Sequence, residues 1–173
     1  MRSVIDTSTL ISLAKVNSLE LIAKLEIEVI MPEEVYEEAV IDGEKKGFAD
    51  SIVIRTFISH RELKILSVKS DFRKVLRKKV GKGLTKGDEA ILSLAIREKA
   101  EIIITNDDGL GKIAMALGFH VMATADLLMK VLKKKLLSFK EFEVLIRGLV
   151  IENRLSSAVA ELYLTEGKKY VEG

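Results

Sequence analysis

Hydrophobic residues fall along the chain in two patterns that alternate. Short, nearly unbroken apolar runs predict strands at residues 2–5, 28–31, 63–66, 101–105 and 120–122. Between and after them, apolar residues recur at helical spacing, around residues 10–14, 32–40, 49–57, 71–80, 88–99, 113–117, 125–134, 139–150 and 156–164. Strands that alternate with helices favour a parallel sheet with helices on both faces, which is the α/β class.

Length and composition limit the organisation of the chain. Its 173 residues suffice for one well-packed domain, so we expect a single domain over residues 1–173, with a core of about 1–135 and C-terminal helices at about 138–165. The chain has no cysteine, which excludes disulfides and thiolate metal sites. No run approaches the ~18–20 uncharged residues of a membrane helix, and the first strand leaves no room for a signal peptide. We therefore expect a cytoplasmic protein that does not contact a membrane.

Four acidic residues stand at comparable places relative to the predicted strands. Asp6 ends the first strand, Glu38 lies in the helix after the second, Asp88 opens the helix before the fourth, and Asp107 follows the fourth. Ligands of open α/β sheets bind at the carboxyl ends of the strands. Carboxylates there would suit Mg²⁺ or Mn²⁺, and metal so held can promote hydrolysis of a phosphodiester.

Each of these acids also has a purely structural interpretation. Asp6 and Asp107 could cap the helices that follow them. Thr85 and Asp88 have the spacing of a capping box, and Glu38 lies among acids that could form a solvated helix face. Spacing alone therefore leaves the metal site suggested rather than settled.

Basic residues gather in one stretch although the net charge is only +2. Eight lysine and arginine residues lie between Lys69 and Lys86, against the single acid Asp71. The stretch leads directly into Asp88, so it could guide a phosphate backbone toward the acids. The candidate RNA-binding residues are Lys78, Lys79, Lys82 and Lys86. An ordinary solvated helix is an equally good interpretation.

Four segments carry a resemblance to a known family. They are Val4-Ile5-Asp6-Thr7-Ser8, then Pro32 to Glu38, then Leu84 to Ala90 with Leu94-Ala95, and finally Ile104-Thr105-Asn106-Asp107. In this order and at these separations they resemble a PIN domain, the nuclease fold of the toxins of VapBC-type toxin–antitoxin modules. The helices after about Phe139 lie beyond the compact family core and resemble the longer archaeal-type branch.

The resemblance implies a three-layer fold with four or five parallel strands in the order 3-2-1-4-5. It also implies that Asp6, Glu38, Asp88 and Asp107 meet at the carboxyl edge, where they would bind Mg²⁺ or Mn²⁺ and act in catalysis. Thr7 or Ser8, and Thr105 or Asn106, would orient the carboxylates or metal-bound waters. Glu37 or Glu34 could replace Glu38, Glu89 could replace Asp88, and Asp108 is a fifth candidate. Members of the family are commonly Mg²⁺- or Mn²⁺-dependent ribonucleases, and many are homodimers.

Two alternatives deserve comparison. Gly109 to Ala114 matches a dinucleotide-binding fingerprint, but Asp107 and Asp108 would repel a pyrophosphate there. The stronger rival is a PIN-like module that binds RNA or a protein without cutting. We expect a metal-dependent endoribonuclease, and the toxin of a toxin–antitoxin pair is one form it could take, with a small antitoxin as partner. We also expect a homodimer, formed through apolar stripes of the C-terminal helices at Leu127, Leu128, Val131, Leu145 and Leu149.

Overall fold

Five parallel strands form one sheet at the centre of the molecule. The structure is a computed structural model that describes residues 1–81 and 83–173. The strands are β1 (Arg2–Ile5), β2 (Glu28–Pro32), β3 (Lys64–Leu66), β4 (Ile102–Ile104) and β5 (His120–Met122). They lie in the order β3-β2-β1-β4-β5, with Val4 opposite both Ile30 and Ile103. The α/β class and the strand order 3-2-1-4-5 are confirmed.

Helices connect the strands and cover the sheet. They are α1 (Thr7–Lys15), α2 (Glu33–Tyr36), α3 (Gly43–Lys45), α4 (Ala49–Arg61), α5 (Ser70–Val80), α6 (Lys86–Arg97), α7 (Asp108–Ala116), α8 (Thr124–Lys133), α9 (Phe139–Ile151) and α10 (Ser157–Glu172). Two short 3₁₀ turns span Leu19–Leu21 and Ala23–Leu25, and a π-helical segment, Glu37–Asp42, joins α2 to α3.

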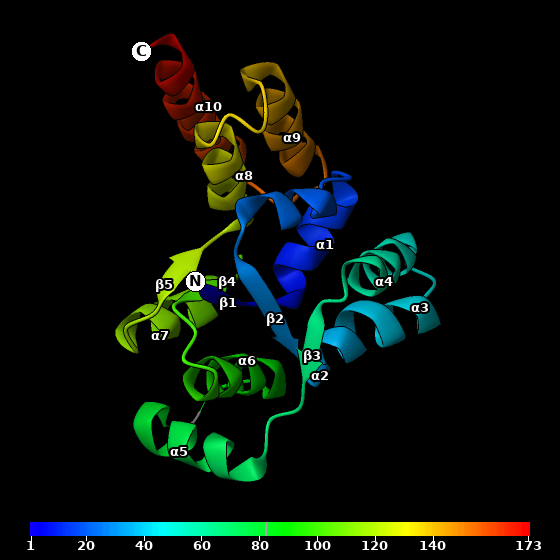
Figure 1. The fold of residues 1–173 in the computed structure, drawn as a ribbon, viewed down its shortest axis with the longest axis vertical. Helices are drawn as coiled ribbons and strands as arrows, with labels where there is room; N and C mark the ends of the chain where they lie inside the picture. The colour runs from blue at the N-terminus through cyan, green and yellow to red at the C-terminus, as the bar shows by residue number, and fades with distance from the viewer. Residues whose placement is uncertain (82) are drawn as a thin grey trace.

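The helices form a layer on each side of the sheet (Figure 1). One layer holds α1, with α4 and α8 packed beside it, and the other holds α6 and α7, with α5 packed outside α6. Both faces of the central strands are therefore covered, and Val4, Ile5, Ile103 and Ile104 are fully buried. This double burial explains why β1 and β4 consist of unbroken apolar residues instead of an alternating pattern.

The last helix is longer than the sequence pattern predicts. We expected it to end near residue 165, but α10 continues to Glu172. Gly167 lies inside α10, where an added Cβ would be 2.8 Å from Phe142 Cε1 and 3.1 Å from Leu132 Cδ2. The glycine thus permits close packing of α10 on α8 and α9, and it does not end the helix.

The residues expected at a dimer interface are used within the chain. Leu127, Leu128, Val131 and Leu149 are buried, and Leu145 is partly buried against the core. They hold α8, α9 and α10 to one another and to the sheet domain. The apolar stripes therefore give no support to a homodimer, because packing inside one chain already explains them.

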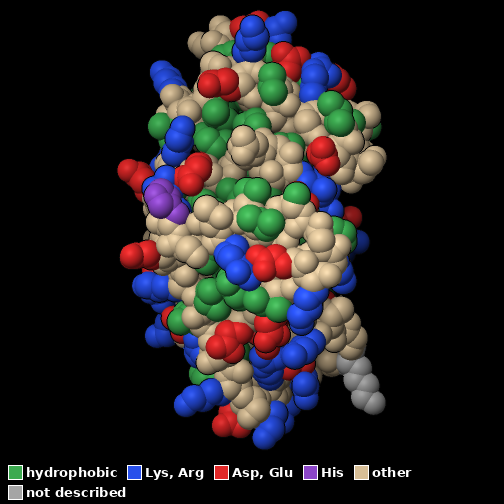
Figure 2. Space-filling view, turned by 90° about the vertical axis from the view of Figure 1, so that its right-hand side faces the viewer, with side chains coloured by type: hydrophobic (Ala, Val, Ile, Leu, Met, Phe, Trp, Pro, Cys, Tyr) green, Lys and Arg blue, Asp and Glu red, His purple; other side chains and the backbone are tan. Residues whose placement is uncertain are grey.

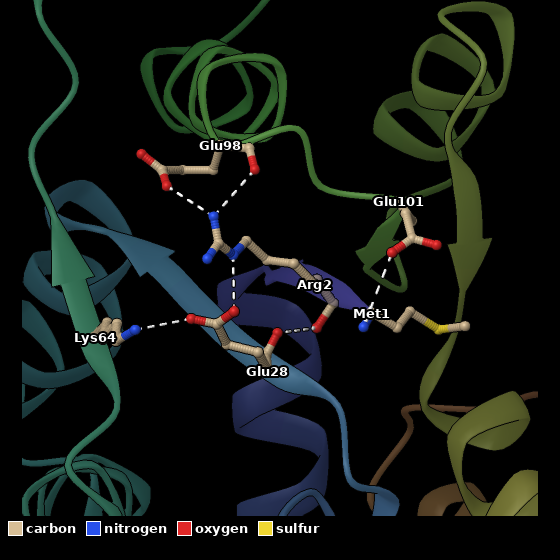
Figure 3. Close-up of polar contacts among 7 residues, drawn as sticks. Met1, Arg2, Glu28, Lys64, Glu98 and Glu101 are labelled. Atoms are coloured by element: carbon tan, nitrogen blue, oxygen red, sulfur yellow. Dashed lines mark hydrogen bonds and ion pairs between the residues drawn. The ribbon is translucent and has the colours of Figure 1, made fainter.

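The amino edge of the sheet carries a network of ion pairs (Figure 3). Arg2 binds Glu28 at 2.9 Å and Glu98 at 3.1 Å, and Lys64 binds Glu28 at 2.8 Å. Hydrogen bonds from Lys64 and Arg2 lower the pKa of Glu28 to about 2. The charges of Arg2, Glu28 and Lys64 are therefore paired with one another and with Glu98 at this edge.

The outer surface mixes charged and apolar side chains. Viewed from the side of α3 and α4, hydrophobic patches lie among acidic and basic residues (Figure 2). The large exposed apolar residues of this region include Phe48, Ile52 and Val53. Among the described residues, no helix combines the length and apolar character that crossing a bilayer requires.

Candidate active site

A pocket at the carboxyl edge of the sheet brings together acids from four separate parts of the chain. Asp6 follows β1 and Asp107 follows β4, the neighbouring strand. Asp88 lies in the first turn of α6, and Glu38 lies in the π-helical segment. The pocket is lined by Asp6, Thr7, Ser8, Ile11, Glu38, Thr85, Gly87, Asp88, Asp107 and Arg154.

Asp6 is held by two hydroxyl groups. Ser8 Oγ donates to Asp6 Oδ2 at 2.7 Å, and Thr105 Oγ1 donates to the same oxygen at 2.8 Å. Asp6 is the N-cap residue of α1, but its side chain makes no capping hydrogen bond. The capping interpretation of Asp6 is therefore wrong. Its carboxylate instead accepts hydrogen bonds from Ser8, in α1, and from Thr105, which follows β4.

Glu38 reaches the pocket from an unusual stretch of helix. The Thr7 hydroxyl donates to Glu38 Oε2 at 3.2 Å, which ties this side chain to the start of α1. The wider π-helical turn is rare and is frequently found at functional sites. Gly87, in the first turn of α6, lies beside the carboxylate: a Cβ there would be in ordinary contact with Glu38 Oε2 at 3.9 Å.

Asp88 and Asp107 both cap helices, as the structural interpretation predicts. Asp88 forms a capping box with Thr85: each backbone N–H binds the other side chain, at 3.1 and 3.2 Å. Asp107 Oδ1 accepts from the Leu110 N–H at 2.7 Å. These bonds fix the two carboxylates in place, which is compatible with a further role.

The four carboxylates share one property. Each uses a single oxygen for hydrogen bonds to the protein, namely Asp6 Oδ2, Glu38 Oε2, Asp88 Oδ2 and Asp107 Oδ1. Within residues 1–81 and 83–173, the other oxygen of each accepts no hydrogen bond from the protein. None of these four free oxygens is among the buried atoms without a partner. The pocket thus presents fixed acids whose remaining oxygens are open to a ligand.

The other acidic candidates do not line this pocket. Glu34 forms an ion pair with Arg73, and Glu89 is buried against Arg77, which binds it through two nitrogens at 2.8 and 3.0 Å. Glu37 and Asp108, like Glu34 and Glu89, are not among the residues that line the pocket. Glu38 and Asp88 are therefore the members of their local acidic groups that face the shared pocket.

The side chain of Asn106 binds other polar groups and not a carboxylate, unlike Thr7, Ser8 and Thr105. Its side-chain nitrogen donates to Ser12 Oγ at 3.0 Å and to Thr124 Oγ1 at 2.8 Å, and its oxygen accepts from the Thr124 N–H at 2.8 Å. It joins the β4 loop to α1 and α8. Of the residues expected to orient the acids, Thr7, Ser8 and Thr105 contact a carboxylate, whereas Asn106 does not.

Three of the candidate RNA-binding lysines, Lys78, Lys79 and Lys86, are not among the residues that line the pocket. Lys78 and Lys79 are exposed on α5 and Lys86 begins α6. In the part of the chain that the structure describes, none of the three forms an ion pair. Lys82 falls outside the described residues. The arginines of the same helix, Arg73 and Arg77, are engaged with Glu34 and Glu89.

Arg154 is a pocket residue that the sequence reasoning missed. It lies in the turn between α9 and α10, helices that we expected to lie beyond the compact family core, and it is partly buried in the pocket wall. A basic residue in a turn between two amphipathic helices gives no signal of the surface it will reach. Only the docking of the C-terminal helices on α1 places it here.

The comparisons with known proteins agree with this fold. The model of the DUF3368 family, described as a PIN domain, matches residues 2–167. The chain therefore belongs to the PIN-domain family, whose members are typically nucleases. The match extends through α9 and into α10, so it includes the C-terminal helices.

The fold is also similar to that of a solved structure. The chain is similar to a chain of VapBC2 from Rickettsia felis, crystallised with a DNA fragment from its promoter, with a TM-score of 0.50 and 17% identity. The match covers 71% of this chain and 98% of that one, and at this identity it supports the fold alone. No curated protein matches the chain.

Proposed function

We propose that this protein is a metal-dependent endoribonuclease whose active site is the pocket of Asp6, Glu38, Asp88 and Asp107. The observation that carries the proposal is the shared state of the four carboxylates. Each is fixed through one oxygen and leaves the other available in the same pocket. Fixed anions without protein partners at the carboxyl edge of a parallel sheet are suited to a cationic ligand. Membership in the PIN-domain family supports hydrolysis of nucleic acid as the activity.

The donor set fits Mg²⁺ or Mn²⁺, which prefer carboxylate oxygens and water. Among the described residues, no three acidic or histidine side chains lie close enough together to form a ready-made metal shell. A metal ion would therefore be held by one or two carboxylates, with water completing its coordination, as is usual for Mg²⁺. Asp6 and Asp107, which follow neighbouring strands, are the expected direct ligands, and Asp88 and Glu38 would bind the water molecules that complete the coordination of the ion. Such an ion would polarise the phosphoryl group and lower the pKa of an attacking water.

The protein itself supplies orientation. Ser8 and Thr105 hold Asp6, Thr7 holds Glu38, and the two helix caps hold Asp88 and Asp107. Because these bonds use only one oxygen of each acid, they restrict rotation of the carboxylate and leave its second oxygen available to a metal ion. Residues that orient ligands in this way typically contribute 10–100-fold to affinity or activity.

Matched pairs of substitutions test the site. We expect Asp107→Asn to lower RNA cleavage by more than about 100-fold, beyond the effect of a residue that only orients a ligand. Its neighbour Asp108→Asn, outside the pocket, should leave the rate nearly unchanged. Glu38→Gln and Glu37→Gln form a second pair of the same design. Wild-type protein should lose activity in EDTA and recover it with Mg²⁺ or Mn²⁺. Equal rates for both members of each pair would refute the proposed active site.

A second function, RNA binding without cleavage, is favoured by one observation. The described acidic side chains do not converge into a complete metal shell. A binding module would hold RNA in the presence of Mg²⁺ without cutting it, and Asp6→Asn would retain that affinity. The cleavage assay with and without EDTA separates the two functions.

The proposed partners are RNA and a small antitoxin protein. The similar Rickettsia felis chain comes from VapBC2 bound to promoter DNA, and the antitoxin partner is proposed here by analogy with that shared fold. Co-purification of the product of an adjacent gene, with loss of RNA cleavage in the complex, is the expected result. A homodimer remains a prediction, and light scattering at micromolar concentration tests it.

A further inference from the structure

The turn between α9 and α10 brings one positive charge into the acidic pocket. Asn153 in this turn has φ 55°, in the left-handed region that asparagine tolerates. The turn is docked on α1: Lys15 Nζ lies 3.6 Å from Glu152, and a Cβ at Gly148 would lie 3.1 Å from Val16 Cγ1. This docking places Arg154 against the first half of α1.

The guanidinium of Arg154 is held there by neutral oxygens. Its Nε donates to Ser12 Oγ at 3.1 Å, and its Nη2 donates to the Ser8 carbonyl at 3.4 Å. Ser8 is also the residue whose hydroxyl binds Asp6. The same segment of α1 therefore positions both an acid and a cation of the pocket.

The cation is not neutralised by the acids beside it. Arg154 lines the pocket with four carboxylates, yet among residues 1–81 and 83–173 it forms no ion pair, and its Nη1 makes no hydrogen bond to the protein. An arginine that served only to offset these acids would be expected to form an ion pair with one of them. Its remaining donors are instead free for an anion that enters the pocket.

An RNA phosphate is the anion that this arrangement suits. A phosphodiester that approaches four carboxylates is repelled, and a fixed positive charge on the pocket wall offsets that repulsion. The planar guanidinium also matches the spacing of two phosphate oxygens.

We propose that Arg154 is the phosphate-binding residue of this pocket, and that its guanidinium contacts the non-bridging oxygens of an RNA phosphodiester. The inference rests on the proposed function for the identity of the ligand. It assigns a substrate-binding role to the C-terminal helices, which the sequence pattern placed outside the core.

Binding measured without metal tests this role apart from cleavage. The probe is a fluorescein-labelled single-stranded RNA of mixed sequence, titrated in EDTA at several salt concentrations and followed by anisotropy. Arg154→Gln keeps an N–H donor near the position of Nε, within reach of Ser12 Oγ, but removes the charge. We expect it to weaken binding about 10-fold, and to lower the slope of log affinity against log salt by about 0.7, the value for one phosphate contact on a single strand. Arg147→Gln, on the exposed face of α9, should match the wild type.

The outcomes separate this inference from the proposed function. A reduced salt slope in Arg154→Gln supports the role of Arg154 even if the wild type binds RNA without cutting it, which would refute only the nuclease. If the wild type cuts RNA and Arg154→Gln has its full slope, the nuclease stands and the inference fails. A further result would also overturn the inference. If Arg154→Gln binds Mn²⁺ more tightly than the wild type by calorimetry, and its salt slope for RNA binding is unchanged, then Arg154 only offsets the charge of the acids. If Arg154→Gln does not fold, Arg154→Met is titrated in the same way: a lower salt slope supports the phosphate contact, and the wild-type slope refutes it.

Discussion

The hydroxyl of Thr105 donates a hydrogen bond of 2.8 Å to Asp6 Oδ2, across 99 positions of the chain. The same oxygen of Thr105 accepts from the Asp107 N–H at 3.0 Å. One buried hydroxyl therefore sets the positions of two acids on adjacent strands.

Thr105→Val removes this hydroxyl while keeping the branched shape of the side chain. We expect RNA cleavage to fall by about 10–100-fold, as is typical when an orienting group is lost. Thr105→Ser keeps the hydroxyl and should retain most of the activity. Circular dichroism must show the same fold in both variants. Equal activity in Thr105→Val and the wild type would mean that Asp6 needs no such support.

The ion pair of Arg73 and Glu34 predicts a large effect on stability. The two side chains are only 17% and 14% exposed, and Glu34 Oε2 is buried without a hydrogen-bond partner. Arg73→Ala would leave a carboxylate buried without its cation, and we expect a loss of about 3 kcal/mol in the free energy of unfolding. Chemical denaturation measures it.

Two further variants test whether the loss of stability in Arg73→Ala comes from a buried, unpaired charge. Lys74→Ala breaks a pair with Asp71 whose side chains are 70% and 86% exposed, so its effect should stay within about 0.5 kcal/mol. The double variant Arg73→Met with Glu34→Leu should recover much of the loss, because no charge stays buried. A small effect of Arg73→Ala alone would show that Glu34 is readily rehydrated.

The close packing around Gly167 predicts that a larger residue there lowers the stability of the protein. In Gly167→Ala, the new Cβ would meet Phe142 at 2.8 Å, closer than real contacts allow. Alanine favours a helix by about 1 kcal/mol over glycine, but overpacking typically costs 1–3 kcal/mol. We expect a net loss of stability, seen as a lower thermal midpoint. Lys168→Ala, exposed in the same helix, should show no such loss, and a gain for Gly167→Ala would contradict the packing described here.

The ion-pair network at Glu28 predicts that the stability of the fold depends on pH. The pKa of Glu28 is lowered to about 2 in the folded protein, from an ordinary value of 4.5, by Lys64 and Arg2. Between these values the unfolded chain binds more protons, so the contribution of Glu28 to stability is full above pH 4.5 and is lost as the pH falls through about 2.

The matching experiment compares thermal midpoints of the wild type and Glu28→Gln from pH 7 to pH 2. The wild type should be more stable at neutral pH, and the difference should shrink below pH 4.5. Glu37→Gln, an exposed acid outside the network, controls for the general effect of removing a charge. A difference that stays constant with pH would show that Glu28 acts through packing alone.

The sequence pattern predicts the sheet and the edge where the acids lie. Strands buried on both faces read as apolar runs, and each of β1 and β4 is followed closely by an acid, so Asp6 and Asp107 could be assigned to one edge. Thr85 and Asp88 could be identified as a capping box because that motif depends on local spacing.

Contacts between distant segments are what the pattern could not supply. An apolar stripe such as Leu127 and Leu128 looks the same whether it packs inside the chain or against a second copy. Gly167 looks like a helix end unless its neighbour Phe142 is known. Arg154 reaches the pocket only because α9 docks on α1, and that docking depends on a close approach at Gly148 which has no local signature.

The position of Arg154 also bears on when the pocket is complete. Ser8 and Arg154, which meet in its wall, are 146 positions apart in the chain. A ribosome releases the strands and all four acids before it releases Arg154, and N-terminal parts of a protein generally fold first. A partly synthesised chain would thus hold the acids without their cation. If Arg154 binds RNA as proposed, the pocket can bind an RNA phosphate through this residue only after α9 and the turn that follows it have been synthesised and have docked on α1.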